Sequence, residues 1–240
     1  MAATDTRRRI LDAALACFLG EGYEQTTIAR LRELSGVSNG ALFHHFPSKE
    51  AIADALFVDA IASFQEGLWD LLRRKPRSLR AALRGAISHQ LSWIEEHPDL
   101  ARFVYMRGHL AWESPAGSEV AELNRDLAAA FRDWMAPLVE AGEVRPRSML
   151  VINAIVTGPG HAIAQRWLAG QLDVPPTAFA DELTDAAWAA LRGTPIAARR
   201  ARPTPAHQGR VALELVAGDG SVVAQGQATA ELVPIQRARG

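Results

Sequence analysis

The chain has 240 residues, of which 48% are hydrophobic and 22% charged, and its net charge is −1. This length allows one large or two small domains with a sizeable core, and the composition is ordinary for a soluble globular protein. A single cysteine, Cys17, excludes an intrachain disulfide, and because no signal peptide or membrane-length apolar run is present, we expect a cytoplasmic protein without a membrane partner.

The first 47 residues predict a three-helix domain. The first helix is expected over about residues 6–20, with apolar side chains four residues apart on its inner face: Ile10, Ala14 and Phe18. The chain then turns, and Thr26 or Thr27 is the expected N-cap of the second helix. The free backbone N–H groups at such a helix start are suited to a phosphate contact.

The second and third predicted helices meet at the tripeptide Gly36-Val37-Ser38. Gly36 suits the left-handed residue that ends a helix, and Ser38 suits the N-cap of the next one. The buried face of this pair would contain Ile28, Leu31, Leu34, Leu42 and Phe46. The third helix would expose Ser38, Asn39, Gly40, Phe43 and His44. Two helices joined in this way form a helix-turn-helix, whose second helix can enter the DNA major groove, although any helical hairpin shares the spacing.

Individual side chains of the third helix indicate how it could read DNA. The Asn39 amide can pair with an adenine edge, Gly40 lets the backbone approach closely, and His44 can donate to a phosphate or a base. We interpret His45 as a packed or helix-capping residue. Composition argues against DNA binding, because residues 1–50 carry six Arg or Lys and six Asp or Glu, so few phosphates could be neutralised.

Residues 6–55 contain, in order, RILDAAL, F-x-x-x-G-Y, T-T, GVS-x-GAL-x-HHF and PSKEA. In these motifs and their spacing, the block resembles the TetR family of transcriptional regulators. The resemblance implies that Lys49, in the first turn of the fourth helix, lies near the DNA backbone. Two residues depart from the usual family pattern: Asn39 stands where lysine is common, and Phe43 where tyrosine is frequent. Each change removes an expected phosphate contact, although Phe43 could still touch a thymine methyl group or a sugar.

A long fourth helix is predicted from its N-cap Ser48 to about Arg74, where Lys75-Pro76-Arg77 breaks it. Apolar residues spaced along one face, from Ile52 to Leu71, carry the helix this far. In the family that the chain resembles, this connecting helix swings when a ligand binds and changes the separation of the two DNA-reading helices.

Residues 78–193 are predicted to be helical throughout. In the last two helices, at about 147–169 and 177–192, Gly158-Pro159-Gly160 should kink or break the first, and Thr177 should cap the second. The resemblance implies a homodimer that joins through this helix pair, although the same residues could form plain intrachain core.

The helical region also carries side chains that suit a small-molecule pocket. An apolar lining could be built from Trp69, Trp93, Phe103, Met106, Trp112, Phe131 and Trp134. Polar anchors could be Arg107, His109, Asn153 and His161. Aromatic residues at helical spacing are also the usual content of a packed core, so each of these residues has a structural interpretation as well. The enrichment predicts a flat or apolar effector without identifying it.

Catalysis and cofactors are not indicated. The seven histidines and one cysteine show no metal-ligand spacing, and the adjacent His44 and His45 would point about 100° apart on a helix. No Gly-x-Ser-x-Gly elbow and no phosphate-binding glycine loop is present. We therefore predict neither an enzyme nor a bound cofactor or metal.

The tail differs from the helical region. An Ala-, Arg- and Pro-rich linker leads into alternating apolar residues around Gly218-Asp219-Gly220, which predicts a β-hairpin with strands at about 210–217 and 221–233. A lone hairpin is marginal in water, so we expect it to pack on the helices or to pair with a second copy. The stretch faintly resembles the closing strands of hotdog-fold acyl thioesterases, which leaves an acyl-ester-handling enzyme as an alternative.

The predicted fold is mainly all-α, with about nine helices: a helix-turn-helix DNA-binding domain (1–47), a helical ligand-binding and dimerisation domain (48–193), a linker (194–209) and a β-hairpin extension (210–234). The predicted function is that of a TetR-like, homodimeric regulator, a repressor that leaves double-stranded operator DNA when a small apolar or aromatic effector binds. A regulator controlled by a protein partner, without a small molecule, is a further alternative. The residues predicted to contact DNA are Thr26, Thr27, Ser38, Asn39, Gly40, Phe43, His44 and Lys49.

Overall fold

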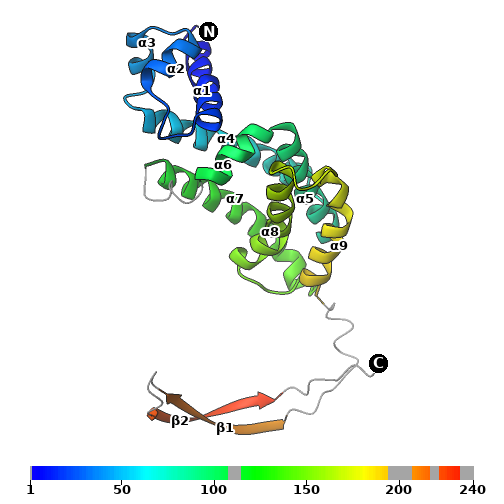
Figure 1. Cartoon of the computed structure of the whole chain (residues 1–240). Coiled ribbons are helices and arrows are strands. Elements are labelled where there is room, and N and C mark those ends of the chain that lie inside the picture. Colours follow the sequence, from blue (N-terminus) through cyan, green and yellow to red (C-terminus); the bar gives the residue numbers. More distant parts are fainter. Residues whose placement is uncertain (1, 108–114, 194–206, 217–221, 233–240) are drawn as a thin grey trace. The chain divides into compact units, whose positions relative to one another are not determined.

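The computed structural model describes residues 2–107, 115–193, 207–216 and 222–232, with side chains described for 4–106 and 116–193. The chain divides into two compact units, 1–195 and 196–240 (Figure 1).

In the first unit the described residues form nine α-helices, as predicted for a mainly all-α fold, and one short 3-10 helix. Their bounds are α1 (Ala2–Gly20), α2 (Ile28–Ser35), α3 (Asn39–His45), α4 (Lys49–Arg73), α5 (Leu79–Glu96), α6 (Pro98–Arg107), α7 (Pro115–Glu140), α8 (Met149–Leu168), the 3-10 helix η1 (Pro176–Phe179) and α9 (Ala180–Leu191). None of the described helices is long and apolar enough to cross a membrane.

The second unit contains two strands, β1 (His207–Val216) and β2 (Val222–Leu232). They pair antiparallel, from His207 opposite Leu232 to Val216 opposite Val222. The side chains of this unit lie outside those described, so packing of the hairpin on the helices or on a second copy stays a prediction.

Local capping explains the tight turn between α2 and α3. Helix α2 ends at Gly36, whose φ of 64° is the left-handed conformation that glycine adopts without strain. Helix α3 begins after Ser38, whose hydroxyl accepts a hydrogen bond from Ala41 N at 3.1 Å. Both predicted caps are confirmed, and Thr27 rather than Thr26 is the N-cap of α2.

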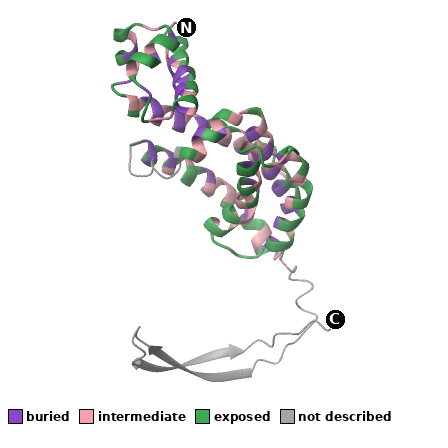
Figure 2. Ribbon diagram, in the orientation of Figure 1, coloured by how far each residue is buried: buried purple, intermediate pink, exposed green. Residues whose placement is uncertain are grey.

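The core of the three-helix domain includes residues from helices of the body. Phe18 of α1 stacks on Phe103 of α6, with ring centroids 5.9 Å apart. Helix α4 adds Ile52 and Phe57, and α7 adds Val120. Figure 2 shows the buried residues gathered along α1 and continuing into α4. The domain therefore shares one continuous apolar cluster with the body.

One predicted core residue of α2 is exposed. Leu34 has 49% of its surface exposed, whereas Leu31 and Ser35 are buried. At 100° per residue, Leu34 lies about 90° from the centre of the face that carries Ile28 and Leu31. Ser35 occupies that face instead, where its hydroxyl donates to Leu31 O at 2.6 Å. The prediction for Leu34 is wrong because spacing by three drifts around a helix.

Helix α4 connects the three-helix domain to the body through contacts on both sides. Near the domain, the Arg7 guanidinium of α1 makes two hydrogen bonds to the Asp59 carboxylate, at 2.6 and 3.1 Å. Further along, the His89 ring of α5 lies against Gly67 and stacks on Phe64, with centroids 5.3 Å apart. His89 Nε2 donates to the Phe64 carbonyl at 2.7 Å. Glycine at position 67 therefore lets α5 approach α4 closely.

Two predictions about the last helices need correction. Helix α8 runs unbroken through Gly158-Pro159-Gly160, so the predicted break is wrong, while the alternative, a kink at Pro159, stays a prediction. Thr177 does not cap α9 but lies in η1, where its N–H and hydroxyl donate to the Glu95 carboxylate at 2.6 and 3.2 Å. These two hydrogen bonds to Glu95, which is distant in the sequence, therefore hold Thr177 in η1.

The contact of Gly67 with His89 gives a test of how α4 is held. A Cβ at position 67 would lie 2.1 Å from His89 Cε1. The ring cannot move away without losing its hydrogen bond to Phe64. Gly67→Ala should therefore lower the free energy of unfolding by about 1–3 kcal/mol, measured by urea denaturation. Gly20→Ala is the matched control, because a Cβ there meets no atom within 4 Å. Equal urea midpoints for the two variants would contradict this account.

Candidate nucleic-acid interface and internal cavities

The outer face of α3 and its N-cap presents polar and aromatic groups to solvent. The exposed residues are Ser38, Asn39, Gly40, Phe43 and His44. Phe43 keeps 45% of its surface exposed, whereas Leu42, on the opposite face, is buried. A Cβ at Gly40 would meet no atom within 4 Å, so packing does not require glycine there and the backbone is open to a partner. The structure thus brings these five predicted residues onto one surface.

The two threonines that precede α2 lie in opposite environments. Thr27 is exposed, and its hydroxyl accepts from Arg30 N at 3.2 Å. Thr26 is only 1% exposed, and its hydroxyl donates to Gly22 O at 2.8 Å. Packing against the loop therefore keeps the Thr26 side chain from the surface, while the predicted phosphate contact through the backbone N–H groups at the start of α2 stays a prediction.

Lys49 holds the loop between α1 and α2. Its Nζ donates to the carbonyl oxygens of Tyr23 at 2.7 Å and Thr26 at 3.0 Å. The ammonium also lies 4.4 Å from the centroid of the Tyr23 ring, a cation–π distance. A phosphate contact by Lys49, as predicted, would have to replace these bonds.

Most of the cations in the first 50 residues are engaged inside the helical unit. Arg9 donates to two carbonyls at the C-terminal end of α2, and Arg30 pairs with two carboxylates. Arg7 and Lys49 have such partners too, and Arg8 makes an exposed ion pair with Asp12 at 4.0 Å, so five of the six cations are engaged. Positive charge for phosphate neutralisation is therefore scarce on this surface.

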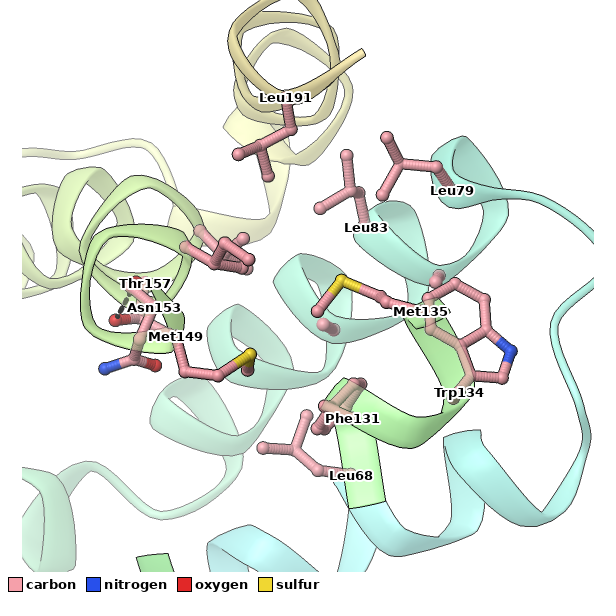
Figure 3. A pocket seen from close by; sticks show the side chains of 14 residues that line it. Leu68, Leu79, Leu83, Phe131, Trp134, Met135, Met149, Asn153, Thr157 and Leu191 are labelled. Carbon is pink, nitrogen blue, oxygen red and sulfur yellow. Dashed lines mark hydrogen bonds between the residues drawn. The ribbon is translucent and has the colours of Figure 1, made fainter. Parts of the chain in front are cut away.

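Two cavities adjoin inside the helical body. The polar cavity, of about 220 Å³, lies among α4, α5, α6, α7 and α8, and its polar lining includes Gln65, Gln90, Tyr105, Asn124 and His161. The apolar cavity, of about 90 Å³, lies among α4, α5, α7, α8 and α9, and its lining includes Leu83, Phe131, Trp134, Met135, Met149 and Leu191 (Figure 3). Leu68, Asn153 and Thr157 line both cavities and form the wall between them.

A hydrogen bond between α6 and α8 closes one side of the polar cavity. The Tyr105 hydroxyl lies 2.7 Å from Nδ1 of His161. Desolvation by the surrounding protein lowers the pKa of His161 and raises the pKa of Tyr105, so both groups are neutral at pH 7. The donor and acceptor roles depend on the tautomer of His161: the Tyr105 hydroxyl donates when the ring proton is on Nε2 and accepts when it is on Nδ1. His161 also keeps an edge exposed to solvent and thus stands at the mouth of the cavity.

Two buried glutamines bring further polar atoms to this cavity. Gln65 Nε2 donates to Asn124 Oδ1 at 2.8 Å, and Gln90 Nε2 donates to Thr157 O at 3.0 Å. The Oε1 atoms of both glutamines are buried and accept no hydrogen bond from the described residues. A Cβ at Gly160 would lie 2.8 Å from Gln90 Oε1, so this glycine makes room for the amide between α5 and α8.

Comparison with known proteins identifies the family. Residues 10–56 match the family model of bacterial regulatory proteins, tetR family. Over 150 residues the chain is 34% identical to the HTH-type transcriptional repressor Rv1474c of Mycobacterium tuberculosis. The matched segment covers 58% of this chain and 69% of that protein. The chain belongs to the TetR family.

Other relatives of this TetR-family protein match shorter segments or the fold. Over 75 residues the chain is 41% identical to the repressor AcnR of Corynebacterium glutamicum, which covers 29% of this chain and 40% of AcnR. A TetR family regulator from Marinobacter aquaeolei shares the fold with a TM-score of 0.67 at 21% identity, over 80% of this chain and 97% of that one. The regulator FadR of Bacillus subtilis, solved with stearoyl-CoA, gives a TM-score of 0.61 at 17% identity, over 75% of this chain and 96% of that one.

The structure separates the residues predicted for the effector pocket of this TetR-family chain. Phe131, Trp134 and Asn153 line the apolar cavity, and Trp93, Asn153 and His161 line the polar cavity. The side chains of three others lie outside those described: Arg107, His109 and Trp112.

Three predicted pocket residues lie elsewhere. Phe103 points into the core of the DNA-reading domain against Phe18, and Met106 is 60% exposed. Trp69 is half-buried and lines neither cavity. Residue type does not tell which face of its helix meets a cavity, so an effector contact by these three residues stays a prediction that neither cavity supports.

Sequence reasoning also missed the polar lining formed by Gln65, Gln90 and Tyr105. A signal for Gln90 was present, since it lies three residues after Ile87 and four before Ile94, on the apolar face of α5, and it is only 1% exposed. A polar residue inside an apolar helix face indicates a buried hydrogen-bonding site.

The two roles assigned to Lys49 and Asn39 can be separated by stability. Lys49→Met removes a charged donor from two loop carbonyls and should lower the free energy of unfolding by about 1–3 kcal/mol. Asn39→Ala changes an exposed side chain and should alter it by less than about 0.5 kcal/mol. Urea denaturation of both variants measures the difference. If the Lys49→Met protein were as stable as the wild type, Lys49 would not be needed to hold the loop and would be free to contact DNA.

Proposed function

We propose that the protein is a homodimeric TetR-family transcriptional repressor that binds double-stranded operator DNA through α3 and leaves it when a small molecule enters the helical body. The observation that carries this proposal is the exposed polar face of α3, which the Gly36 turn presents away from the core. Named repressors among its relatives support the same conclusion. We keep residues 1–47 as the DNA-binding domain and 48–193 as the effector and dimerisation domain.

Sequence reading would depend on hydrogen bonds more than on charge. The Asn39 amide and the His44 ring supply donors to base edges or phosphates, and Phe43 supplies an apolar surface for a thymine methyl group. The open backbone at Gly40 would let α3 approach the groove floor. Since most nearby cations are bonded inside the protein, binding would gain little from counterion release.

Helix α6 provides a physical connection between the cavities and the DNA-reading domain. On one side, Phe103 packs on Phe18 in the core of that domain. On the other side, Ala101, Val104 and Tyr105 line the polar cavity. An effector that fills the cavity and displaces α6 would therefore also displace α1, and through it the orientation of α3.

The two cavities support control by a small molecule over control by a protein partner alone. Together they offer an apolar region and a region with convergent polar groups, as binding sites for small ligands do. The solved FadR, which has the same fold, holds stearoyl-CoA. Because the relatives are transcriptional regulators, we propose no catalytic activity for this chain or its tail.

Dimerisation is proposed through α8 and α9. A single recognition helix reads too few bases for useful specificity, so a second copy is needed. Helix α8 carries one charged residue, Arg166, in twenty positions. Leu150 on this helix is 79% exposed in the single chain, and α9 exposes alanines on its outer side. Such apolar surface is typical of a subunit interface.

Two glycines test DNA reading without altering the fold. A Cβ at Gly40 or at Gly20 would meet no atom within 4 Å, so both alanine variants should be as stable as the wild type. Gly40→Ala should weaken binding to the intergenic DNA upstream of the gene by tenfold or more, because the added methyl group holds α3 away from the bases, at about 1.4 kcal/mol per tenfold. Gly20→Ala should bind as the wild type does. Fluorescence anisotropy measures both, and equal affinities would remove α3 as the reading helix.

The engagement of cations inside the domain predicts a shallow salt dependence. If about two cations per protomer reach phosphates, a dimer should show a slope of about −4 in a plot of log affinity against log salt concentration. The same anisotropy assay from low to high salt measures the slope. A slope near −10 would show that the internal bonds of residues such as Lys49 and Arg9 break on DNA.

A further inference from the structure

A third cavity opens at the end of α7, next to the start of α8. It has a volume of about 420 Å³, and its rim carries three arginines: Arg132 on α7, and Arg145 and Arg147 in the loop before α8. We call it the arginine groove. Its floor is apolar and includes Met135, Val139, Met149 and Ile152. The groove therefore combines a cationic rim with an apolar base.

The positive charge of this groove is not balanced within the described residues. All three arginines are exposed, and none of them forms an ion pair with a described carboxylate. Glu140 is the one acidic residue in the lining, so three guanidinium groups face one carboxylate. Guanidinium groups present paired N–H donors that match carboxylate and phosphate oxygens. The rim is thus complementary to an anion.

The loop that carries two of these arginines is held in place. Arg145 N donates to Leu191 O at 2.9 Å, and Gly193 N donates to Glu143 O at 2.6 Å. Val144, between them, is buried against the end of α9. The backbone positions of the arginines are therefore set before any ligand arrives, which lowers the entropy cost of binding.

The arginine groove continues into the apolar cavity. Met135, Met149 and Ile152 line both spaces. Figure 3 shows the side chains of Met135 and Met149 projecting into the space between the helices. Methionine side chains are unbranched and rotate readily, so the partition that they form can open. Beyond it, the wall formed by Leu68, Asn153 and Thr157 lies between the apolar cavity and the polar one.

We propose that these spaces form one channel for an anionic amphiphile, with an acidic head group on Arg132, Arg145 and Arg147 and an apolar chain that passes Met135 and Met149 into the apolar cavity. As a statement about the effector, this inference rests on the proposed function. The head group is a carboxylate or a phosphate monoester, since both match the guanidinium donors. The chain is unbranched and flexible enough to follow the methionine partition.

The test compares ligands that share a ten-carbon chain and differ in the head group. Decanoate, decyl phosphate, decanol and decyltrimethylammonium are titrated into the full-length protein by isothermal titration calorimetry. Both anions should bind about tenfold or more tightly than decanol, and the cation should bind most weakly. The stronger of the two anions identifies the head group. Equal affinities for decanol and the anions would overturn the proposal.

Chain length tests whether the groove and the apolar cavity are continuous. From hexanoate to decanoate, affinity should rise by up to about fourfold for each CH₂ group that becomes buried. A free anion site at the rim would show no such rise, and inorganic phosphate would then bind as well as decyl phosphate. That result would reduce the groove to a surface anion site and overturn the channel.

Arginine variants test the rim. Arg132→Gln and Arg147→Gln change exposed side chains that form no ion pair with a described carboxylate, so the fold should be unaffected. Each should weaken decanoate binding by about tenfold and leave decanol binding unchanged. Arg125→Gln is the matched control, because it removes the same charge from an exposed position on α7 outside the groove lining. Equal losses in all three variants would show a general charge effect and overturn the assignment.

A DNA-binding assay separates this inference from the proposed function. Decanoate should lower the DNA affinity of the wild type and have a smaller effect on Arg132→Gln. Arginine-dependent binding of decanoate with unchanged DNA affinity would support the channel and overturn its regulatory role. A protein that binds no DNA under any condition would overturn the proposed function, while the calorimetry would still decide whether the channel exists.

Discussion

The structure depends on an apolar core that the DNA-reading domain does not close by itself. Three short helices over about 47 residues bury too little surface for an independent domain. Phe103 of α6 completes the cluster by stacking on Phe18, and Ile52 and Phe57 of α4 extend it. Because α4 and α6 also line the polar cavity, the position of α3 is mechanically tied to the contents of the body. Under the proposed function, this shared core would let a ligand bound in the body act on the three-helix domain.

Close and open contacts between helices alternate along the body. At Gly67 the His89 ring lies directly on α4, and at Gly160 the Gln90 amide lies directly on α8. Helices α4, α5 and α8 also line both cavities. The two glycines therefore allow close contacts between helices, and the cavities leave space for a ligand between the same helices. A ligand larger than a cavity would shift whole helices, because packed protein interiors deform little.

Charge is used in opposite ways at the two ends of the helical unit. In the reading domain, Arg7, Arg9 and Lys49 bond to carboxylates or carbonyls and serve the fold. At the far end, Arg132 and Arg147 face an apolar groove without ion pairs in the described part of the chain. Unpaired arginines on a surface that the fold does not need them to support are available for a partner. The distribution explains why a net charge of −1 says little about either site.

The sequence by itself determined the features that depend on neighbours along the chain. The left-handed Gly36, the caps Ser38 and Ser48, and the exposed face around Asn39 follow from backbone preference and helix periodicity. Only the tertiary structure decided which groups meet across helices. It buries Thr26 and packs Phe103 against Phe18, away from the cavities. It also bonds Lys49 to the loop before α2, and Gln65 and Gln90 line the same cavity. The physical reason is that burial and hydrogen bonding depend on partners far away in the chain, which periodicity along one helix does not specify.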